Sequence, residues 1–310
     1  PLISRNPLTS LLLNPIRNCT PDITRQTLES AQFARYIEFP KKGASCPLYI
    51  FQTTNHINVL TRTTMEIYAL NLDDLKLLQS VRLPAEVISY SFAQTNDSLG
   101  RDSNDFALLC STSTASTVYE YQSGMITRQS QVPHNTHVLG LTPNDVVVGC
   151  RKGIRSIHGD KYVPLEGHAT AIQYPFVATS RGVIYRIDSE DTMSVSVVCR
   201  VKATILSFTL AGDHLLIHTV SKQIIMYSLK TNHFVPVKLS VDPISYYYRD
   251  NFLVGVSQDS IIFVCLDESG LVDVISFDHG HYLNTIPFIV FDCGYPRILL
   301  ASSSTMQLSL

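Results

Sequence analysis

One unit of sequence recurs along the chain and limits what the chain can fold into: a short apolar run, a tight polar turn, and a second apolar or alternating run. The seven copies are Ile57–Leu70, Phe106–Tyr121, Val146–Ile157, Phe176–Ile187, Leu215–Leu229, Phe252–Leu266 and Ile298–Leu308. Two such runs joined by a short polar turn are typical of a β-hairpin. Successive copies begin roughly 30 to 50 residues apart, which is the period of a four-stranded propeller blade. Each copy is therefore predicted to supply the two middle strands of one blade.

The segments between the copies also favour strands, for example Ala85–Phe92, Ile205–Leu210 and Ile244–Tyr248. A four-stranded blade cannot bury both of its faces alone, whereas a ring of blades covers every face. Closing such a ring needs a strand from one terminus to complete the blade at the other, and Gln32–Phe39 is the candidate. The sequence thus predicts an all-β chain, a seven-bladed β-propeller over residues 32–310.

Residues 1–31 precede this region and are predicted to form a partly helical N-terminal extension. Thr20 and Pro21 suit the N-cap and the first position of a short helix. A separate apolar cluster consists of Leu11, Leu12, Leu13 and Ile16. This cluster is a candidate for binding a partner protein.

The composition of the chain argues against some classes of function and favours one kind of cellular compartment. The 310-residue chain has 24 basic and 26 acidic side chains, and no run of Lys or Arg exceeds two, which argues against direct nucleic-acid binding. No stretch of about 18 uninterrupted apolar residues occurs, so no membrane span is expected. The seven cysteines are scattered without a C-x-x-C pair, which favours a reducing intracellular compartment, nuclear or cytoplasmic.

Sequence motifs for catalysis are not found: no nucleophile elbow, zinc-protease helix, P-loop or dinucleotide fingerprint is present. Asp278-His279-Gly280-His281 has metal-ligand residue types, but a polar turn is the preferred interpretation. His168 is interpreted as satisfying backbone groups instead of acting as a base. We therefore expect no catalytic residue, cofactor or metal, and keep a ligand- or metal-binding propeller enzyme as the alternative.

Two further sets of residues are candidates for partner binding. Tyr246, Tyr247, Tyr248 and Arg249 combine aromatic rings with a cation, as anchor residues at protein interfaces do, although packing between blades would also use them. Arg151, Lys152 and Arg181 occupy equivalent turns in neighbouring copies. They either build one basic rim for an acidic peptide or keep the hairpin edges soluble.

The copies resemble WD40-family repeats, most closely in the segment EGHATAIQYPFVATSRGVIYRID (Glu166–Asp188). This segment has the Gly167-His168 pair, the small-residue strand Ala178-Thr179-Ser180, and Asp188 where the family's terminal dipeptide falls. The chain has no Trp, so no copy carries the full Trp-Asp signature. The resemblance implies a propeller in which the family's network of His, Ser and Asp is complete in this one blade only.

A finer resemblance concerns the Leu-rich leader, the segment Thr136–Ile157 and the ending RILLASSSTMQLSL. In this respect the chain is similar to substrate receptors of cullin-type ubiquitin ligases, and to a counterpart subunit of heterochromatin-silencing complexes that contain a histone methyltransferase. The resemblance implies a non-catalytic scaffold or adaptor, monomeric within a hetero-complex, whose partners are other proteins. Nucleoporin and vesicle-coat propellers are the structural alternatives.

Overall fold

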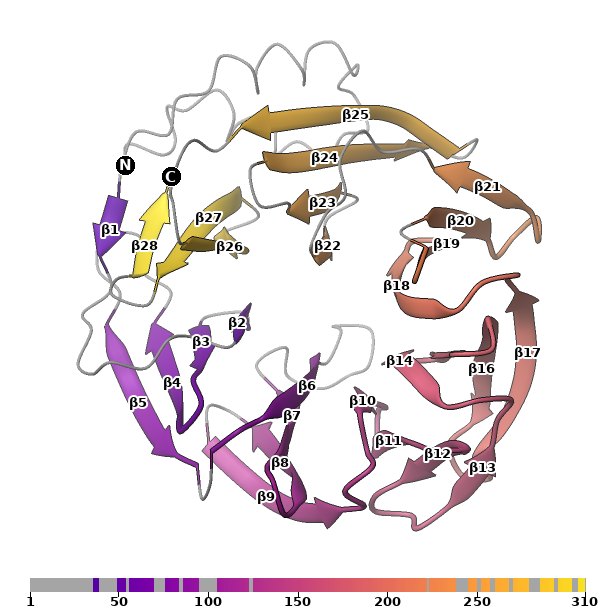
Figure 1. Cartoon of the computed structure of the whole chain (residues 1–310), viewed down its shortest axis with the longest axis horizontal. Coiled ribbons are helices and arrows are strands. Elements are labelled where there is room, and N and C mark those ends of the chain that lie inside the picture. Colours follow the sequence, from indigo (N-terminus) through magenta and orange to yellow (C-terminus); the bar gives the residue numbers. More distant parts are fainter. Residues whose placement is uncertain are drawn as a thin grey trace. The chain divides into compact units, whose positions relative to one another are not determined.

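The computed structural model describes residues 53, 56–69, 76–83, 86–94, 105–122, 125–221 and 223–237, and outside these ranges only the backbone of the strands named below. All of the secondary structure described is β-strand, and the strands form seven four-stranded antiparallel sheets (Figure 1). Contacts between residues divide the chain into two compact units, and each is described by itself. The part of the chain that the structure describes contains no helix long and apolar enough to cross a membrane.

The first unit contains three of the sheets. One consists of β2 (Tyr49–Gln52), β3 (His56–Leu60), β4 (Thr64–Ala69) and β5 (Leu77–Arg82). The next consists of β22 (Ser245–Arg249), β23 (Phe252–Val256), β24 (Ser260–Asp267) and β25 (Gly270–Asp278). The third has the order β1 (Tyr36–Glu38), β28 (Met306–Ser309), β27 (Tyr295–Ser302) and β26 (Thr285–Asp292).

This third sheet confirms that an N-terminal strand completes the C-terminal hairpin. The backbone of β1 pairs with β28, with Tyr36 opposite Ser309 and Glu38 opposite Gln307. The strand lies inside the predicted segment 32–39, although it is shorter.

The second unit contains four sheets, each formed by consecutive strands. Its first two are β6 (Ser89–Gln94), β7 (Phe106–Ser111), β8 (Ser116–Gln122), β9 (Met125–Val132), and β10 (Val138–Leu141), β11 (Val146–Cys150), β12 (Gly153–Ser156), β13 (Tyr162–Pro164). The other two are β14 (Ala169–Gln173), β15 (Phe176–Thr179), β16 (Val183–Ser189), β17 (Ser194–Arg200), and β18 (Ile205–Ala211), β19 (His214–Thr219), β20 (Ile224–Ser228), β21 (Phe234–Val237).

The seven repeated hairpins of the sequence are the middle strand pairs of the seven sheets. They correspond to β3–β4, β7–β8, β11–β12, β15–β16, β19–β20, β23–β24 and β27–β28. Gly212 and Asp213 form the turn from β18 into β19, which begins at His214. The prediction of an all-β chain of four-stranded sheets is thus confirmed.

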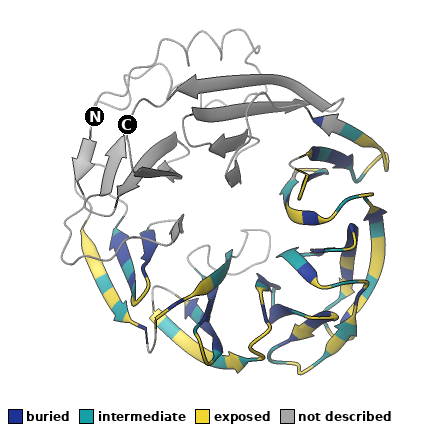
Figure 2. Ribbon diagram, viewed as in Figure 1, coloured by how far each residue is buried: buried dark blue, intermediate teal, exposed yellow. Residues whose placement is uncertain are grey.

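Burial explains why the middle strands are apolar throughout. In the second unit, β7, β11 and β15 are buried along almost their whole length, while the outer strands β9 and β17 are largely exposed (Figure 2). Adjacent residues of a strand point to opposite faces, so a continuously buried strand must be covered on both faces. For β11 and β15, the neighbouring sheets of the unit provide that cover.

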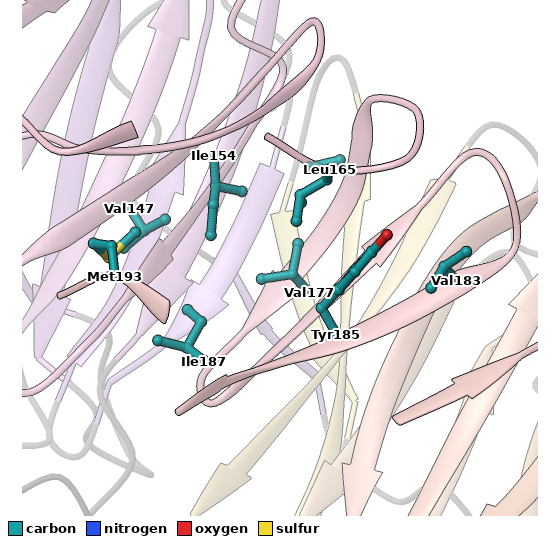
Figure 3. Packing of buried hydrophobic residues seen from close by; sticks show 9 residues of the cluster. Val147, Ile154, Leu165, Val177, Val183, Tyr185, Ile187 and Met193 are labelled. Carbon is teal, nitrogen blue, oxygen red and sulfur yellow. The ribbon is translucent and has the colours of Figure 1, made fainter. Parts of the chain in front are cut away.

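The packing between sheets follows this alternation. Val146 and Val148 of β11 pack against the sheet β6–β9, with Leu109 and Val118, whereas Val147 between them packs against the sheet β14–β17. On the side of the sheet β14–β17, Val147 belongs to a cluster of buried side chains that includes Ile154, Val177 and Tyr185 (Figure 3). Phe176 and Ala178 in turn face the sheet β18–β21. Each sheet of this unit therefore shares one apolar layer with the next.

Candidate interaction surface

One end of the second unit is built from the turns between second and third strands together with the links between sheets. Backbone hydrogen bonds join these segments in series: Leu165 N–H to Lys152 C=O (2.9 Å), Ser180 N–H to His168 C=O (3.0 Å), Val201 N–H to Gly182 C=O (2.7 Å) and Val220 N–H to Thr204 C=O (2.9 Å). We call this surface the turn end and define it as residues 86–88, 112–115, 133–137, 151–152, 165–168, 180–182, 200–206 and 220–221, which includes the first two residues of β18. The turn end includes Arg151, Lys152 and Arg181, which the sequence analysis names as candidates for partner binding.

The turn end is predominantly basic. Its charged residues are Arg151, Lys152, Arg181, Arg200 and Lys202 against Glu86 and Glu166. Arg200 and Glu166 neutralise each other through two N–O contacts of 2.8 and 2.6 Å, and the guanidinium lowers the pKa of the Glu166 carboxyl. Both partners are more than half exposed, so this pair adds little stability.

The other cations of the turn end are available to a partner. Within the described part of the chain, the side chains of Arg151, Lys152, Arg181 and Lys202 form no ion pair. All four residues are exposed. Such cations attract carboxylates at protein–protein interfaces and increase the rate of encounter with an acidic partner.

The turns at the opposite end of the same unit have the reverse charge. Their acidic residues in the described ranges are Asp105, Asp145, Asp160, Glu190, Asp191 and Asp213, against the basic Lys161 and Lys230. Among them, Asp160 forms an ion pair with Arg155, and Asp213 forms one with Lys230. The two ends of the second unit therefore differ in charge: basic residues predominate at the turn end, and acidic residues predominate at the opposite end. Such a distribution attracts negative charge to the turn end and repels it from the other.

Exposed aliphatic side chains accompany the cations. Ile88, Leu206 and Val220 are 70%, 48% and 56% exposed. Leu206 is turned outward by an irregularity in pairing: Ile205 lies opposite Thr219, Ser207 lies opposite His218, and Leu206 between them is left unpaired. Such β-bulges re-aim a side chain. The strand pairing keeps Leu206 near Val220, because Thr204, two residues before Leu206, accepts the Val220 N–H at 2.9 Å. This small apolar patch adjoins the link that carries Lys202.

A groove of about 490 Å³ lies next to the first of the basic turns. Its lining comes from two neighbouring sheets, namely Pro133 and Asn135 of the β9–β10 link, Cys150, Arg151 and Lys152 at the β11–β12 turn, and Arg155, Asp160 and Tyr162 around β12 and β13. Register places Arg155 opposite Tyr162 and Cys150 opposite Gly153, so these side chains share the face of the sheet that looks toward β6–β9.

Some of the charged side chains in the groove have a partner of opposite charge, and others have none among the described residues. Arg155 is held by Asp160, with 3.0 Å from Nε to Oδ1, so its charge is balanced locally. Burial raises the pKa of the Cys150 thiol, which keeps it protonated and makes it a neutral part of the wall. Tyr162 is 51% exposed. The groove therefore combines an aromatic ring, a neutral wall and the two unpaired cations Arg151 and Lys152.

Several sequence-predicted site residues lie outside the described residues. These are Leu11, Leu12, Leu13 and Ile16 of the N-terminal extension. The segment Asp278–His281, interpreted as a polar turn, also lies outside them, except for the backbone of Asp278. For Tyr246, Tyr247, Tyr248 and Arg249 the backbone forms β22, as predicted, and their side chains lie outside the described residues. Among the residues described, no group of three or more His, Cys, Asp and Glu side chains could hold a metal ion.

The hydrogen-bond network implied by the WD40 resemblance is differently placed. In the sheet β14–β17, His168 contacts Ser180 through its backbone, and Asp188 accepts a hydrogen bond from Ser196 at 3.0 Å. A Ser–Asp network forms in the preceding sheet instead. There the Asp145 carboxylate accepts hydrogen bonds from the Ser156 hydroxyl and from the backbone N–H groups of Val146, His158 and Gly159.

Comparison with known proteins supports the fold. No protein-family model and no curated protein matches the chain. A chain in the crystal structure of a mitotic checkpoint complex is 11% identical, with a TM-score of 0.62 over 90% of this chain and 96% of that one. The computationally designed Ika8 protein is 12% identical, with a TM-score of 0.55 over 88% of this chain and 98% of the other.

A third solved structure shares the fold over part of its length. The extracellular domain of BT4673, a putative hybrid two-component system of B. thetaiotaomicron, is 12% identical with a TM-score of 0.58, covering 88% of this chain and 39% of that chain. Likenesses at such low identity show the fold alone. With the four-stranded antiparallel sheets, they define a β-propeller-like all-β protein.

Proposed function

We propose that this chain is a non-catalytic scaffold subunit that binds other proteins through the turn end, within a nuclear or cytoplasmic complex. The observation that carries the proposal is the combination of unpaired cations with the exposed Leu206 and Val220 on one surface. Covering such an aliphatic patch releases water, and the neighbouring cations select the charge of the partner.

In this proposal the seven sheets close into a seven-bladed ring that presents the turn end as a rigid platform. The pairing of β1 with β28 supports closure, because it joins the two ends of the chain in one sheet. Binding sites on rigid scaffolds lose little conformational entropy when a partner docks.

The proposal predicts that a double substitution at the turn end removes the partners. Lys202→Glu with Leu206→Asp reverses one unpaired cation and makes the aliphatic patch polar. The matched control is Arg186→Glu with Val197→Asp, since Arg186 and Val197 are also exposed but lie on β16 and β17 outside the turn end. We expect proteins that co-purify from the native source to fall about tenfold with the first variant and to persist with the control, as quantified by mass spectrometry. Equal recovery from both variants and wild type would overturn the proposal.

In its sharper form, the chain is a substrate-receptor-like subunit of a cullin-type ubiquitin ligase or of a heterochromatin-silencing complex, and residues 1–31 dock on the adaptor. This version is supported by the resemblance of the Leu-rich leader and of the segment Thr136–Ile157 to such substrate receptors. A pull-down with the purified ligase adaptor is expected to capture the full chain and to lose it when residues 1–31 are removed. Capture of both forms to the same extent, or of neither, would eliminate the ligase version and leave the general scaffold role in place.

A further inference from the structure

The groove beside Arg151 and Lys152 has a recognition chemistry of its own. Its volume of about 490 Å³ is comparable to that of small-ligand sites, but the groove is open to solvent, and it is too small to take in a folded domain. A macromolecular partner can therefore enter it only with a short extended stretch of chain. Because the walls come from two adjacent sheets of one unit, the groove is formed by the packing of that unit itself.

The side chains that line the groove divide into an apolar part and a cationic part. Tyr162 contributes an aromatic ring, Pro133 contributes its pyrrolidine ring, and the protonated thiol of Cys150 is a neutral part of the wall. Exposed tyrosines of this kind are enriched at interface anchor points. Arg151 and Lys152 supply the two charges that no described side chain balances.

Asp160 makes the two sides of the groove differ in charge. Its side chain is 76% exposed and holds Arg155, so a carboxylate of the ligand is repelled from that side unless it displaces the pair. The carboxylates of a ligand are instead drawn to Arg151 and Lys152 at the turn. A ligand that fits both parts carries negative charge near an apolar side chain.

We infer that this groove binds an acidic polypeptide segment with an aromatic or large aliphatic side chain among its carboxylates. The inference rests on the proposed scaffold function and names the chemistry of the partner. The apolar side chain of the segment packs on Tyr162 and Pro133, while its carboxylates pair with Arg151 and Lys152. A nucleic acid is the weaker candidate, because two cations beside a carboxylate make few phosphate contacts.

The inference is tested with the full chain and synthetic probes by fluorescence anisotropy. The labelled peptide Glu-Asp-Glu-Phe-Asp-Glu-Asp is compared with a version that has Ala in place of Phe, with a version in which Lys replaces every acidic residue, and with a single-stranded oligonucleotide. We expect saturable binding of the acidic Phe peptide, weakened by salt because exposed charges contribute to it. We expect weaker binding of the Ala version and none of the Lys version or the oligonucleotide.

Variants locate the site. Arg151→Glu and Lys152→Glu are each expected to raise the dissociation constant of the Phe peptide about tenfold, whereas Arg186→Glu, an exposed Arg outside the groove, leaves it within about twofold. Tyr162→Ala is expected to weaken the Phe peptide and not the Ala peptide, which isolates the contact with the ring.

The outcomes separate this inference from the proposed scaffold function. No binding of the acidic Phe peptide, equal loss with Arg186→Glu, or tighter binding of the oligonucleotide would overturn the groove assignment. Co-purifying proteins that still depend on Lys202 and Leu206 would then show that the scaffold role survives with a different partner chemistry. Peptide binding that follows Arg151, Lys152 and Tyr162 supports the inference.

Discussion

Gly182→Ala is expected to destabilise the second unit by about 4 kcal/mol, a large part of the free energy of unfolding of a typical domain. Gly182 lies in the β15–β16 turn with φ of 76°, a left-handed conformation that L side chains adopt at a cost. A Cβ there would lie 2.1 Å from the carbonyl oxygen of Val201 and 2.6 Å from that of Ala203. Both obstacles are backbone atoms, so relief requires moving the link between two sheets.

The local hydrogen bonds explain why that movement is costly. Gly182 donates its N–H to Thr179 C=O at 3.0 Å and accepts the N–H of Val201 at 2.7 Å. Displacing the link breaks the second bond and opens the layer that holds Ile184 and Ile205. Urea unfolding measures the effect, with Arg181→Ala as control, because that exposed neighbour is expected to change the free energy of unfolding by less than about 0.5 kcal/mol. A Gly182→Ala protein as stable as Arg181→Ala would contradict the close approach seen here.

The sequence predicts the middle hairpins because burial on two faces leaves a strong signal. Phe106 to Cys110 is apolar without interruption, and every residue of β7 is buried. The outer strands give a weaker signal: β13 has three residues, and β17 alternates with many exposed positions. Arg151 and Lys152 lie in the β11–β12 turn and Arg181 in the β15–β16 turn, the equivalent turns that the sequence indicates, while their role in partner binding stays a prediction.

The remaining features depend on contacts that no local pattern encodes. The groove needs Pro133 and Asn135 from one sheet opposite Tyr162 from the next, and only packing of the sheets brings them together. The outward turn of Leu206 results from a bulge, and an apolar residue inside an apolar strand gives no hint of it. Thr142-Pro143-Asn144-Asp145 has the residues of a polar turn, but the sequence does not indicate the network around Asp145, because the donors Ser156, His158 and Gly159 lie more than ten residues away.

Asp145 provides the second large effect, a loss of stability that depends on pH. Its carboxylate lies in the β10–β11 turn and accepts the backbone N–H groups of His158 at 3.0 Å and Gly159 at 3.1 Å, both from the β12–β13 turn. The Ser156 hydroxyl also donates to it. Burial alone would raise the pKa of this carboxyl, but the hydrogen bonds from Ser156, His158, Val146 and Gly159 outweigh burial and lower it. Asp145→Ala leaves these donors without their acceptor and is expected to cost about 3 kcal/mol at neutral pH.

The sign of the pH dependence follows from the lowered pKa. A carboxyl whose pKa is lower in the folded than in the unfolded chain contributes stability above the unfolded value, about 3.9, and loses it as pH falls through the folded value. The difference in unfolding free energy between wild type and Asp145→Asn should therefore be constant above about pH 5 and shrink below about pH 4. Glu120, His158 and Glu190 nearby are unchanged in both proteins, so the subtraction isolates the contribution of residue 145. Asp188→Asn, an exposed carboxylate in the neighbouring sheet, should show a difference below about 0.5 kcal/mol throughout. If the gap for Asp145→Asn stayed constant down to about pH 3, the ionised carboxylate would not be what joins the two turns.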